Sequence, residues 1–332
     1  MTPVPFFIDP RPFFNMPWKL RACLLRNMAR WPGGYTAYQL LQRRLGALRR
    51  PSYWKQKLRW QADLAQQAMQ SGAVIEDARV VEVGAGWLPL APMGFWICGA
   101  REIVTYDLNR HLLPDMLRKV LHWMAESEAE LIALYDGVAS PQRVRDCLQK
   151  IREHADRPWR LLEVAGIRYQ APADATDTGL DAGSVDLHYS LSVLEHIPRA
   201  TIAELLREAR RVLKPTGRCV HLIDPKDHFA MTDRSISSIN FLHFSDAEWN
   251  RYAGNFLAYH NRLRDRDFVE LFEQAGFELL AHRYEVDARA LALLKNGFPL
   301  AEPFRDLDAE QLCRNELLLV AGLCSRVGVA NL

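Results

Sequence analysis

The chain has 332 residues but only six cysteines, and none of these is spaced like a metal ligand pair. They lie far apart, at Cys23, Cys98, Cys147, Cys219, Cys313 and Cys324. The lack of a C-x-x-C pair argues against a zinc site or a disulfide framework, and it fits a reducing cytosol. We therefore expect a cytoplasmic protein with no metal site.

Long apolar runs, internal repeats and low-complexity tracts are also missing. No run reaches the ~18 residues that a membrane-spanning helix needs. The longest, Leu88–Ala100, is better explained as a buried helix. The N-terminus lacks the basic-then-apolar order of a signal peptide. Because 49% of the residues are hydrophobic, the sequence predicts a substantial core in one large domain with additions.

Acidic residues are nearly absent from the first 60 positions. These hold 12 Lys and Arg and a single acid, Asp9, whereas the rest of the chain has 30 basic and 39 acidic residues. Such a basic, aromatic segment can contact an anionic membrane surface, bind RNA, or cover a cofactor as a lid with solvated charges. We favour the lid, with peripheral membrane contact second; no known RNA-binding module is present.

The stretch Arg79–Pro92 predicts a β-strand, a tight glycine turn and a helix in direct succession. Gly84, Ala85 and Gly86 form the turn. Glu82 lies at the end of the strand. This unit holds a nucleotide-like ligand over the carboxyl end of a parallel sheet. A carboxylate there repels a pyrophosphate but suits a ligand that carries an ammonium group.

A second strand, Ile103–Asp107, also ends in a carboxylate, 25 residues after Glu82. In a βαβ unit this places Asp107 at the tip of the neighbouring strand, where a carboxylate accepts both hydroxyls of a ribose. An NAD-binding fold uses a similar acid but requires G-x-G-x-x-G. Here Pro89 stands three residues after Gly86 and has no N–H for a phosphate, which disfavours an NAD-dependent oxidoreductase.

These stretches resemble motif I of the class I S-adenosylmethionine-dependent methyltransferases, an acidic residue, any residue, then Gly-x-Gly-x-Gly. Leu88 replaces the third glycine here. The resemblance implies S-adenosylmethionine as cofactor, with Asp107 and Leu108 binding its ribose side. It also implies that Asp174 accepts from the adenine amine while Ala175 offers its N–H to a ring nitrogen. An ordinary turn is the alternative interpretation of the last pair.

The run Asp186–Ile197 resembles motif IV in the small-molecule branch of this family, where D-x-x-x-S…V-L-E-H is frequent. Its strand ends at Ser190 and Leu191, whose backbone carbonyls can hold the methionine ammonium. The run lacks the Asn/Asp-Pro-Pro-aromatic signature, which argues against nucleobase N-methylation. His196 is interpreted as structural rather than as a base.

A general base is needed if the acceptor is a hydroxyl, because the donor is already activated and the protein must mainly align the groups and remove a proton. The candidate is His228, in the segment after the fifth strand, with Asp227 or Asp224 orienting the imidazole. A polar loop with a solvated histidine is the alternative.

The aromatic and polar stretch that follows can wall an acceptor pocket. It spans residues 240–264 and includes Arg262 and Arg264, which suit an anionic acceptor. Loop packing onto the sheet, with exposed arginines, is the other possibility.

The order of elements predicts a three-layer α/β fold. By resemblance it is a Rossmann-like methyltransferase fold with a mostly parallel seven-stranded sheet whose last strand is antiparallel. We expect a basic helical extension over residues 1–77 and a methyltransferase domain over 78–332, with a helical insertion at about 122–156 and acceptor-side loops at about 224–264. A capping box, Thr201 with Glu204, is expected to start the helix before the fifth strand.

The expected function is methyl transfer from S-adenosylmethionine to a small or glycan-like acceptor, at oxygen, with no nucleic acid as partner. The alternative from another class is a non-catalytic cofactor- or nucleotide-binding module that serves a membrane or protein partner.

Overall fold

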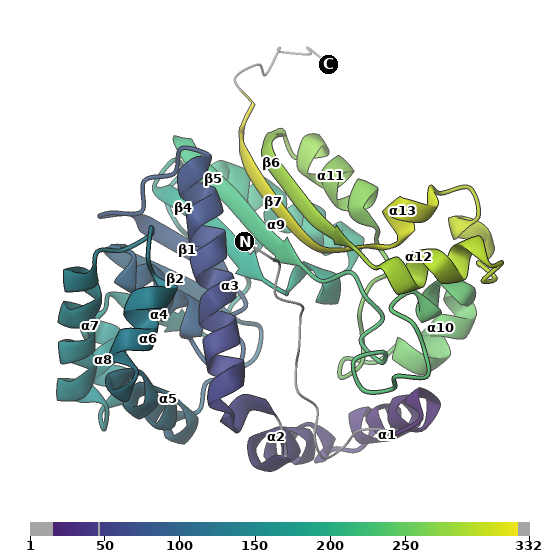
Figure 1. The fold of residues 1–332 in the computed structure, drawn as a ribbon, viewed down its shortest axis with the longest axis horizontal. Coiled ribbons are helices and arrows are strands. Elements are labelled where there is room, and N and C mark those ends of the chain that lie inside the picture. Colours follow the sequence, from purple (N-terminus) through teal and green to yellow (C-terminus); the bar gives the residue numbers. More distant parts are fainter. Residues whose placement is uncertain (1–15, 46, 325–332) are drawn as a thin grey trace. The chain divides into compact units, whose positions relative to one another are not determined.

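The computed structural model describes residues 16–45 and 47–324, and its centre is a seven-stranded sheet (Figure 1). The strands lie in the order β3-β2-β1-β4-β5-β7-β6. Their bounds are β1 Arg79–Val83, β2 Glu102–Tyr106, β3 Ile167–Gln170, β4 Val185–Leu191, β5 Leu213–Ile223, β6 Phe277–Val286 and β7 Arg314–Leu323.

Strand direction agrees with the predicted fold class. β1 pairs in parallel with β2 on one side and with β4 on the other, and β4 pairs in parallel with β5. β7 runs antiparallel to β5. Since parallel strands end at the same edge, the segments after β1, β2 and β4 all leave the sheet there. The predicted Rossmann-like sheet is confirmed.

The helices follow the predicted alternation with the strands. Their bounds are α1 Trp18–Arg30, α2 Gly34–Leu45, α3 Pro51–Gln70, α4 Leu90–Ile97, α5 Pro114–Glu126, α6 Glu128–Leu134, α7 Pro141–His154, α8 Pro158–Val164, α9 Arg199–Val212, α10 Asp246–Ala253, α11 Asp265–Gln274, α12 Ala288–Lys295 and α13 Ala309–Leu312. The predicted helical insertion is present as α6 and α7, with the end of α5 before them.

Local boundaries differ from the prediction around α9. The helix begins at Arg199 with Pro198 as its N-cap, so the expected capping box of Thr201 and Glu204 is wrong. Pro198 fixes the backbone in an extended conformation just before the helix, and this places Thr201 inside the first turn. The helix ends at Val212, and β5 starts at the next residue.

Different helices cover the two faces of the sheet. Phe95 of α4 packs on Tyr189 of β4, and α3 lies across the same face, in front of the strands in Figure 1. On the opposite face His221 of β5 packs against Phe272 of α11. The alternation of side chains along β4 and β5 therefore sends neighbouring residues into two separate core layers.

The chain forms two compact units whose boundaries depart from the predicted division at residue 77. One contains the residues up to Tyr53 together with Asp224–Arg266 and Tyr284–Glu316. The other contains Trp54–Ile223 with Asp267–Arg283 and the chain from Leu317 on. α3 thus belongs almost wholly to the sheet-bearing unit, while α1 and α2 belong with the segments that follow β5 and β6.

The first unit has its own aromatic core. Trp18, Ala22 and Leu25 form the buried stripe of α1, and the Trp18 ring contacts those of Phe229 and Tyr252. The apolar face of α1 is thus buried by the segments that follow β5.

No helix in the described part of the chain is long and apolar enough to cross a membrane.

Candidate functional site

The turn after β1 has the backbone geometry expected of a ligand-binding glycine loop. Gly84 and Gly86 both adopt positive φ angles, 78° and 63°. A Cβ on Gly84 would stand 2.8 Å from a methyl carbon of Val193. Gly84 is therefore required twice, by its left-handed backbone and by the segment after β4 that lies against it.

Glu82 is a buried carboxyl group at the end of β1, with 2% of its surface exposed. Its Oε2 accepts a hydrogen bond of 2.6 Å from the hydroxyl of Thr105 on the neighbouring strand. Burial raises the pKa of Glu82 to about 7, although the bond from Thr105 acts in the other direction. Protonation of Glu82 therefore changes near neutral pH, and a nearby cation would favour its charged form.

Asp107 follows β2 directly and faces the glycine turn. Its Oδ2 accepts from the backbone N–H of Gly86 at 3.2 Å. Burial, and after it the charge of Glu82, raise the pKa of Asp107 to about 8. The charge of Glu82 thus opposes the ionisation of Asp107.

The third predicted acid is placed differently. Asp174 is exposed, and its Oδ1 accepts from both the backbone N–H and the hydroxyl of Thr176, at 2.9 and 2.8 Å. Its loop lies beside the site, because the N–H of Ala173 donates to the carbonyl of Asp107 at 2.9 Å. Ala175 is buried, and Leu108 is 70% exposed.

Ser190 turns its side chain away from Glu82, into the opposite core layer. Its Oγ lies 2.6 Å from Nδ1 of His221, and both residues are fully buried. Any contribution of Ser190 to ligand binding must therefore come from its backbone at the end of β4. For Leu191 the backbone contact stays a prediction. Ser192 follows with a positive φ of 57°, which bends the chain as it leaves the strand.

The site at this edge of the sheet fits an aminoacyl nucleoside such as S-adenosylmethionine. It combines two buried carboxyl groups of raised pKa with a turn in which Gly86 carries no Cβ and meets no heavy atom within 4 Å of where one would stand. Asp107 and Glu82 can accept from ribose hydroxyls and an ammonium group. The assignment of individual contacts remains a prediction.

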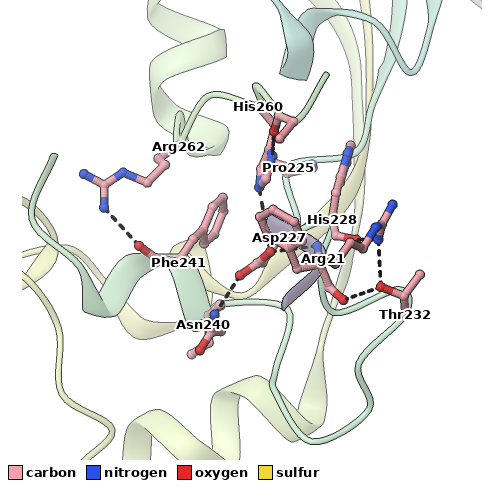
Figure 2. Close-up of polar contacts among 12 residues, drawn as sticks. Arg21, Pro225, Asp227, His228, Thr232, Asn240, Phe241, His260 and Arg262 are labelled. Atoms are coloured by element: carbon pink, nitrogen blue, oxygen red, sulfur yellow. Dashed lines mark hydrogen bonds and ion pairs between the residues drawn. The ribbon is translucent and has the colours of Figure 1, made fainter. Parts of the chain in front are cut away.

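The other unit holds a polar cluster around Asp227, which is fully buried (Figure 2). The carboxylate accepts from the N–H of Phe229 at 2.9 Å and from the side-chain amide of Asn240 at 2.9 Å. Its Oδ1 lies 3.7 Å from Nε2 of His260. Asp227 thus orders the loop after β5 and faces His260, a residue that the sequence did not single out.

His228 stacks on that second histidine, with ring centroids 5.0 Å apart and 14° between the ring planes. Its Nε2 lies 3.3 Å from the backbone carbonyl of Asp224. Because a carbonyl only accepts, Nε2 carries the proton and the lone pair of the neutral ring is on Nδ1. The predicted partnership with Asp224 is thus observed through its backbone rather than its carboxylate.

Helix α1 reaches the same loop. The Arg21 guanidinium donates to the Thr232 hydroxyl at 2.7 Å and to the His228 carbonyl at 3.4 Å (Figure 2). Burial lowers the pKa of Arg21. These contacts between α1 and the segment after β5 were not predicted, because residues about 200 positions apart give no local sequence signal.

The two arginines expected to meet an anionic acceptor have structural partners. Arg262 donates to the carbonyls of Phe241 and Phe244, and it pairs with Asp246. Arg264 is 1% exposed and donates to the carbonyl of Pro225. We therefore assign both to the packing of these loops. The second interpretation also expected exposed arginines, and this part is wrong because both side chains are buried.

Comparison with known proteins gives one family match. A model of the methyltransferase domain matches residues 145–221. No curated protein matches the chain.

Several solved structures are similar to the chain at low sequence identity. A S-adenosylmethionine-dependent methyltransferase from Mesorhizobium loti is 18% identical, with 78% of this chain and 95% of that chain covered and a TM-score of 0.38. One from Methanosarcina mazei is 10% identical, with 77% and 97% covered and a TM-score of 0.42. A geranyl diphosphate methyltransferase solved with S-adenosylmethionine is 12% identical, with 90% and 94% covered and a TM-score of 0.42.

The domain match falls on the part of the chain that runs from α7 to β5, and the sheet around it has the predicted seven strands with the last one, β7, antiparallel to β5. The chain thus has a Rossmann-like fold, and its residues 145–221 match a methyltransferase domain.

Proposed function

We propose that the protein transfers the methyl group of S-adenosylmethionine to an oxygen of a small or glycan-like acceptor, with His228 as general base. The observation that carries the proposal is the histidine pair of the loop after β5. His228 stacks on His260, whose Nε2 faces the buried carboxylate of Asp227 at 3.7 Å. A histidine is the side chain most suited to accept a proton near neutral pH.

Asp227 acts in this proposal as a positioning residue. It holds the loop by accepting from the N–H of Phe229, and its Oδ1 lies 3.7 Å from Nε2 of His260. Nδ1 of His260 lies 2.9 Å from the carbonyl of Ala258. A ring fixed in this way provides a flat support for His228 and restricts its orientation.

The alternative is a non-catalytic module that binds the cofactor for a membrane or protein partner. The two are separated by incubating the protein with methyl-labelled S-adenosylmethionine and a cell extract. Transfer of label to an extract component supports the enzyme, and binding without transfer supports the module.

Replacement of the proposed base tests the mechanism. We expect His228→Ala to lower the turnover of labelled acceptor by about 100-fold or more, the usual contribution of a general base, while cofactor affinity stays within about twofold. Calorimetric titration with S-adenosylhomocysteine and the transfer assay measure the two quantities. His243→Ala is the matched control, since His243 is an exposed histidine of the same unit. An alanine variant with wild-type turnover would rule out His228 as the base.

We also propose that α1 contacts anionic membranes peripherally, in addition to packing on the loops of its own unit. The helix has two apolar stripes. One is buried, whereas Leu20, Leu24 and Trp31 are 58%, 44% and 61% exposed. Lys19 and Arg30 flank the exposed stripe, and both are exposed. Exposed apolar side chains beside basic ones are typical of helices that lie in a membrane interface.

The membrane proposal is tested with the double variant Leu20→Ser/Leu24→Ser in the full chain. We expect its co-sedimentation with phosphatidylserine vesicles to fall well below that of the wild type, because each substitution removes apolar area from the interface. Leu280→Ser is the control, since Leu280 of β6 is 45% exposed at another place in the fold. Equal sedimentation of all three proteins would contradict the proposed membrane contact.

A further inference from the structure

Two histidines and a cysteine meet on the sheet face opposite to Glu82. The pairing of β4 with β5 places His188 opposite Cys219 and Ser190 opposite His221. Side chains two residues apart along a strand share a face, so all four project into one core layer. Each of them is 0% exposed.

The donor atoms of this cluster have the separations of metal ligands. Sγ of Cys219 lies 3.2 Å from Nε2 of His221 and 3.8 Å from Nδ1 of His188. One ligand atom from each of the three residues lies within 4.8 Å of the other two. In a tetrahedral zinc site, bonds of about 2.0–2.1 Å to nitrogen and 2.3 Å to sulfur put the donor atoms about 3.4–3.6 Å apart. The two distances to sulfur bracket this range, so the site would close on an ion with small side-chain movements.

His221 is already oriented as a ligand. The 2.6 Å contact between its Nδ1 and the hydroxyl of Ser190 fixes the ring and turns Nε2 toward the sulfur. Histidines that bind metals almost always use their second nitrogen in such a contact. His188 turns Nδ1 toward the sulfur, at 3.8 Å, so its buried Nε2 would be the second nitrogen of this ligand.

The protonation states suit a soft metal ion. All three side chains are fully buried, and burial disfavours a charge on an imidazole or a thiol. Binding of an ion replaces the thiol proton, which is released to solvent, and leaves one thiolate and two neutral imidazoles on the metal.

The positive charge that would remain has a counter-charge in the same layer. The Glu208 carboxylate on α9 acts on His188 electrostatically and raises its pKa against the larger effect of burial. Hydrogen bonds from Arg211 and Thr178 outweigh the burial of Glu208 and lower its pKa to about 2, so it is ionised. A buried anion nearby reduces the cost of a cation in this layer.

We propose that His188, Cys219 and His221 bind one thiophilic ion, zinc or copper(I), which joins β4 to β5 inside the core. Imidazole and thiolate ligands select these two ions over magnesium, calcium and manganese. The scattered cysteines had led us to expect no metal site. Strand pairing brings together residues 31 positions apart, and no local spacing motif reports such a site.

The test is the metal content of the full chain. The protein is produced in media supplemented with zinc or with copper, passed through gel filtration, and analysed by mass spectrometry for metal per chain. We expect close to one equivalent of one of the two ions, with the medium that gives it identifying which. Cys219→Ser and His221→Gln are expected to lose the ion, whereas Cys147→Ser, a change of another buried cysteine on α7, retains it.

A second measurement does not depend on the folding of the variants. Wild-type protein refolded with cobalt(II) is expected to show a thiolate-to-metal charge-transfer band, which the Cys147→Ser protein retains. The proposal would be overturned if wild-type protein from both media contained metal only at the background level. A cobalt spectrum without the charge-transfer band would also overturn it.

Discussion

At the scale of single residues, the most informative feature is a pair of buried acids whose pKa values are raised well above the ordinary range. Burial raises the pKa of Glu82 to about 7 and that of Asp107 to about 8. An unfolded chain ionises both groups near pH 4. Between pH 4 and these raised values the folded state binds more protons than the unfolded one, so the stability of the ligand-free protein falls as pH rises through this window.

Such a cost is typical of a site that awaits a ligand. Thr105 and Tyr189 contact the carboxyl group of Glu82, and the N–H of Gly86 and Tyr169 contact that of Asp107, but no basic side chain of the described residues forms an ion pair with either acid. A cofactor that brings an ammonium group and two ribose hydroxyls would supply the missing partners. The energetic conflict at the two strand tips is therefore part of the binding function rather than a defect of the fold.

At the scale of elements, α1 is held to the loop after β5 by a contact at its first turn. The backbone N–H of Trp18 donates to Oδ2 of Asp233 at 2.8 Å. Burial alone would raise the pKa of Asp233, but the bonds from Ser235 and Trp18 outweigh it and lower this pKa. Pro17, the residue before α1, has no side chain that can cap the helix. The carboxylate of Asp233, more than 200 positions away, therefore accepts from the backbone N–H at the start of α1.

Removal of this contact gives a test of how α1 is anchored. We expect Asp233→Ala to destabilise the protein by about 1 kcal/mol, the usual cost of a lost helix cap, and to lower the melting temperature. Asp233→Asn is the matched control, because an asparagine oxygen also accepts from the helix N-terminus. Differential scanning calorimetry of the three proteins measures the change. An alanine variant as stable as the wild type would show that α1 does not depend on Asp233.

At the scale of the whole molecule, the sequence predicted what local patterns encode. Strand, glycine turn and acid at Glu82 and Asp107 are contiguous signals, and the structure brings these residues together. Parallel strands then determine which edge they share. The mostly parallel seven-stranded sheet with its antiparallel last strand followed from the alternation of elements and the resemblance.

What the sequence did not predict depends on contacts between distant segments. His260 joins His228 across 32 positions, and Asp233 joins Trp18 across 215. The division at residue 77 likewise missed that α1 packs on loops after β5, because the buried stripe of α1 does not say which partner covers it. Burial of an amphipathic helix is visible in a sequence, but the identity of its partner is not.

The binding of S-adenosylhomocysteine across pH tests the central claim most directly, that the buried acids after β1 and β2 hold the cofactor. Because Asp107 must lose its proton to accept the ribose hydroxyls, we expect affinity to rise by up to tenfold per pH unit from pH 6 to about pH 8, with proton release in calorimetry, and to level off above. Asp107→Asn should weaken binding by about tenfold or more and flatten this profile, whereas Asp177→Asn, a change of an exposed acid, should alter neither. An affinity that is independent of pH and indifferent to Asp107→Asn would contradict the account.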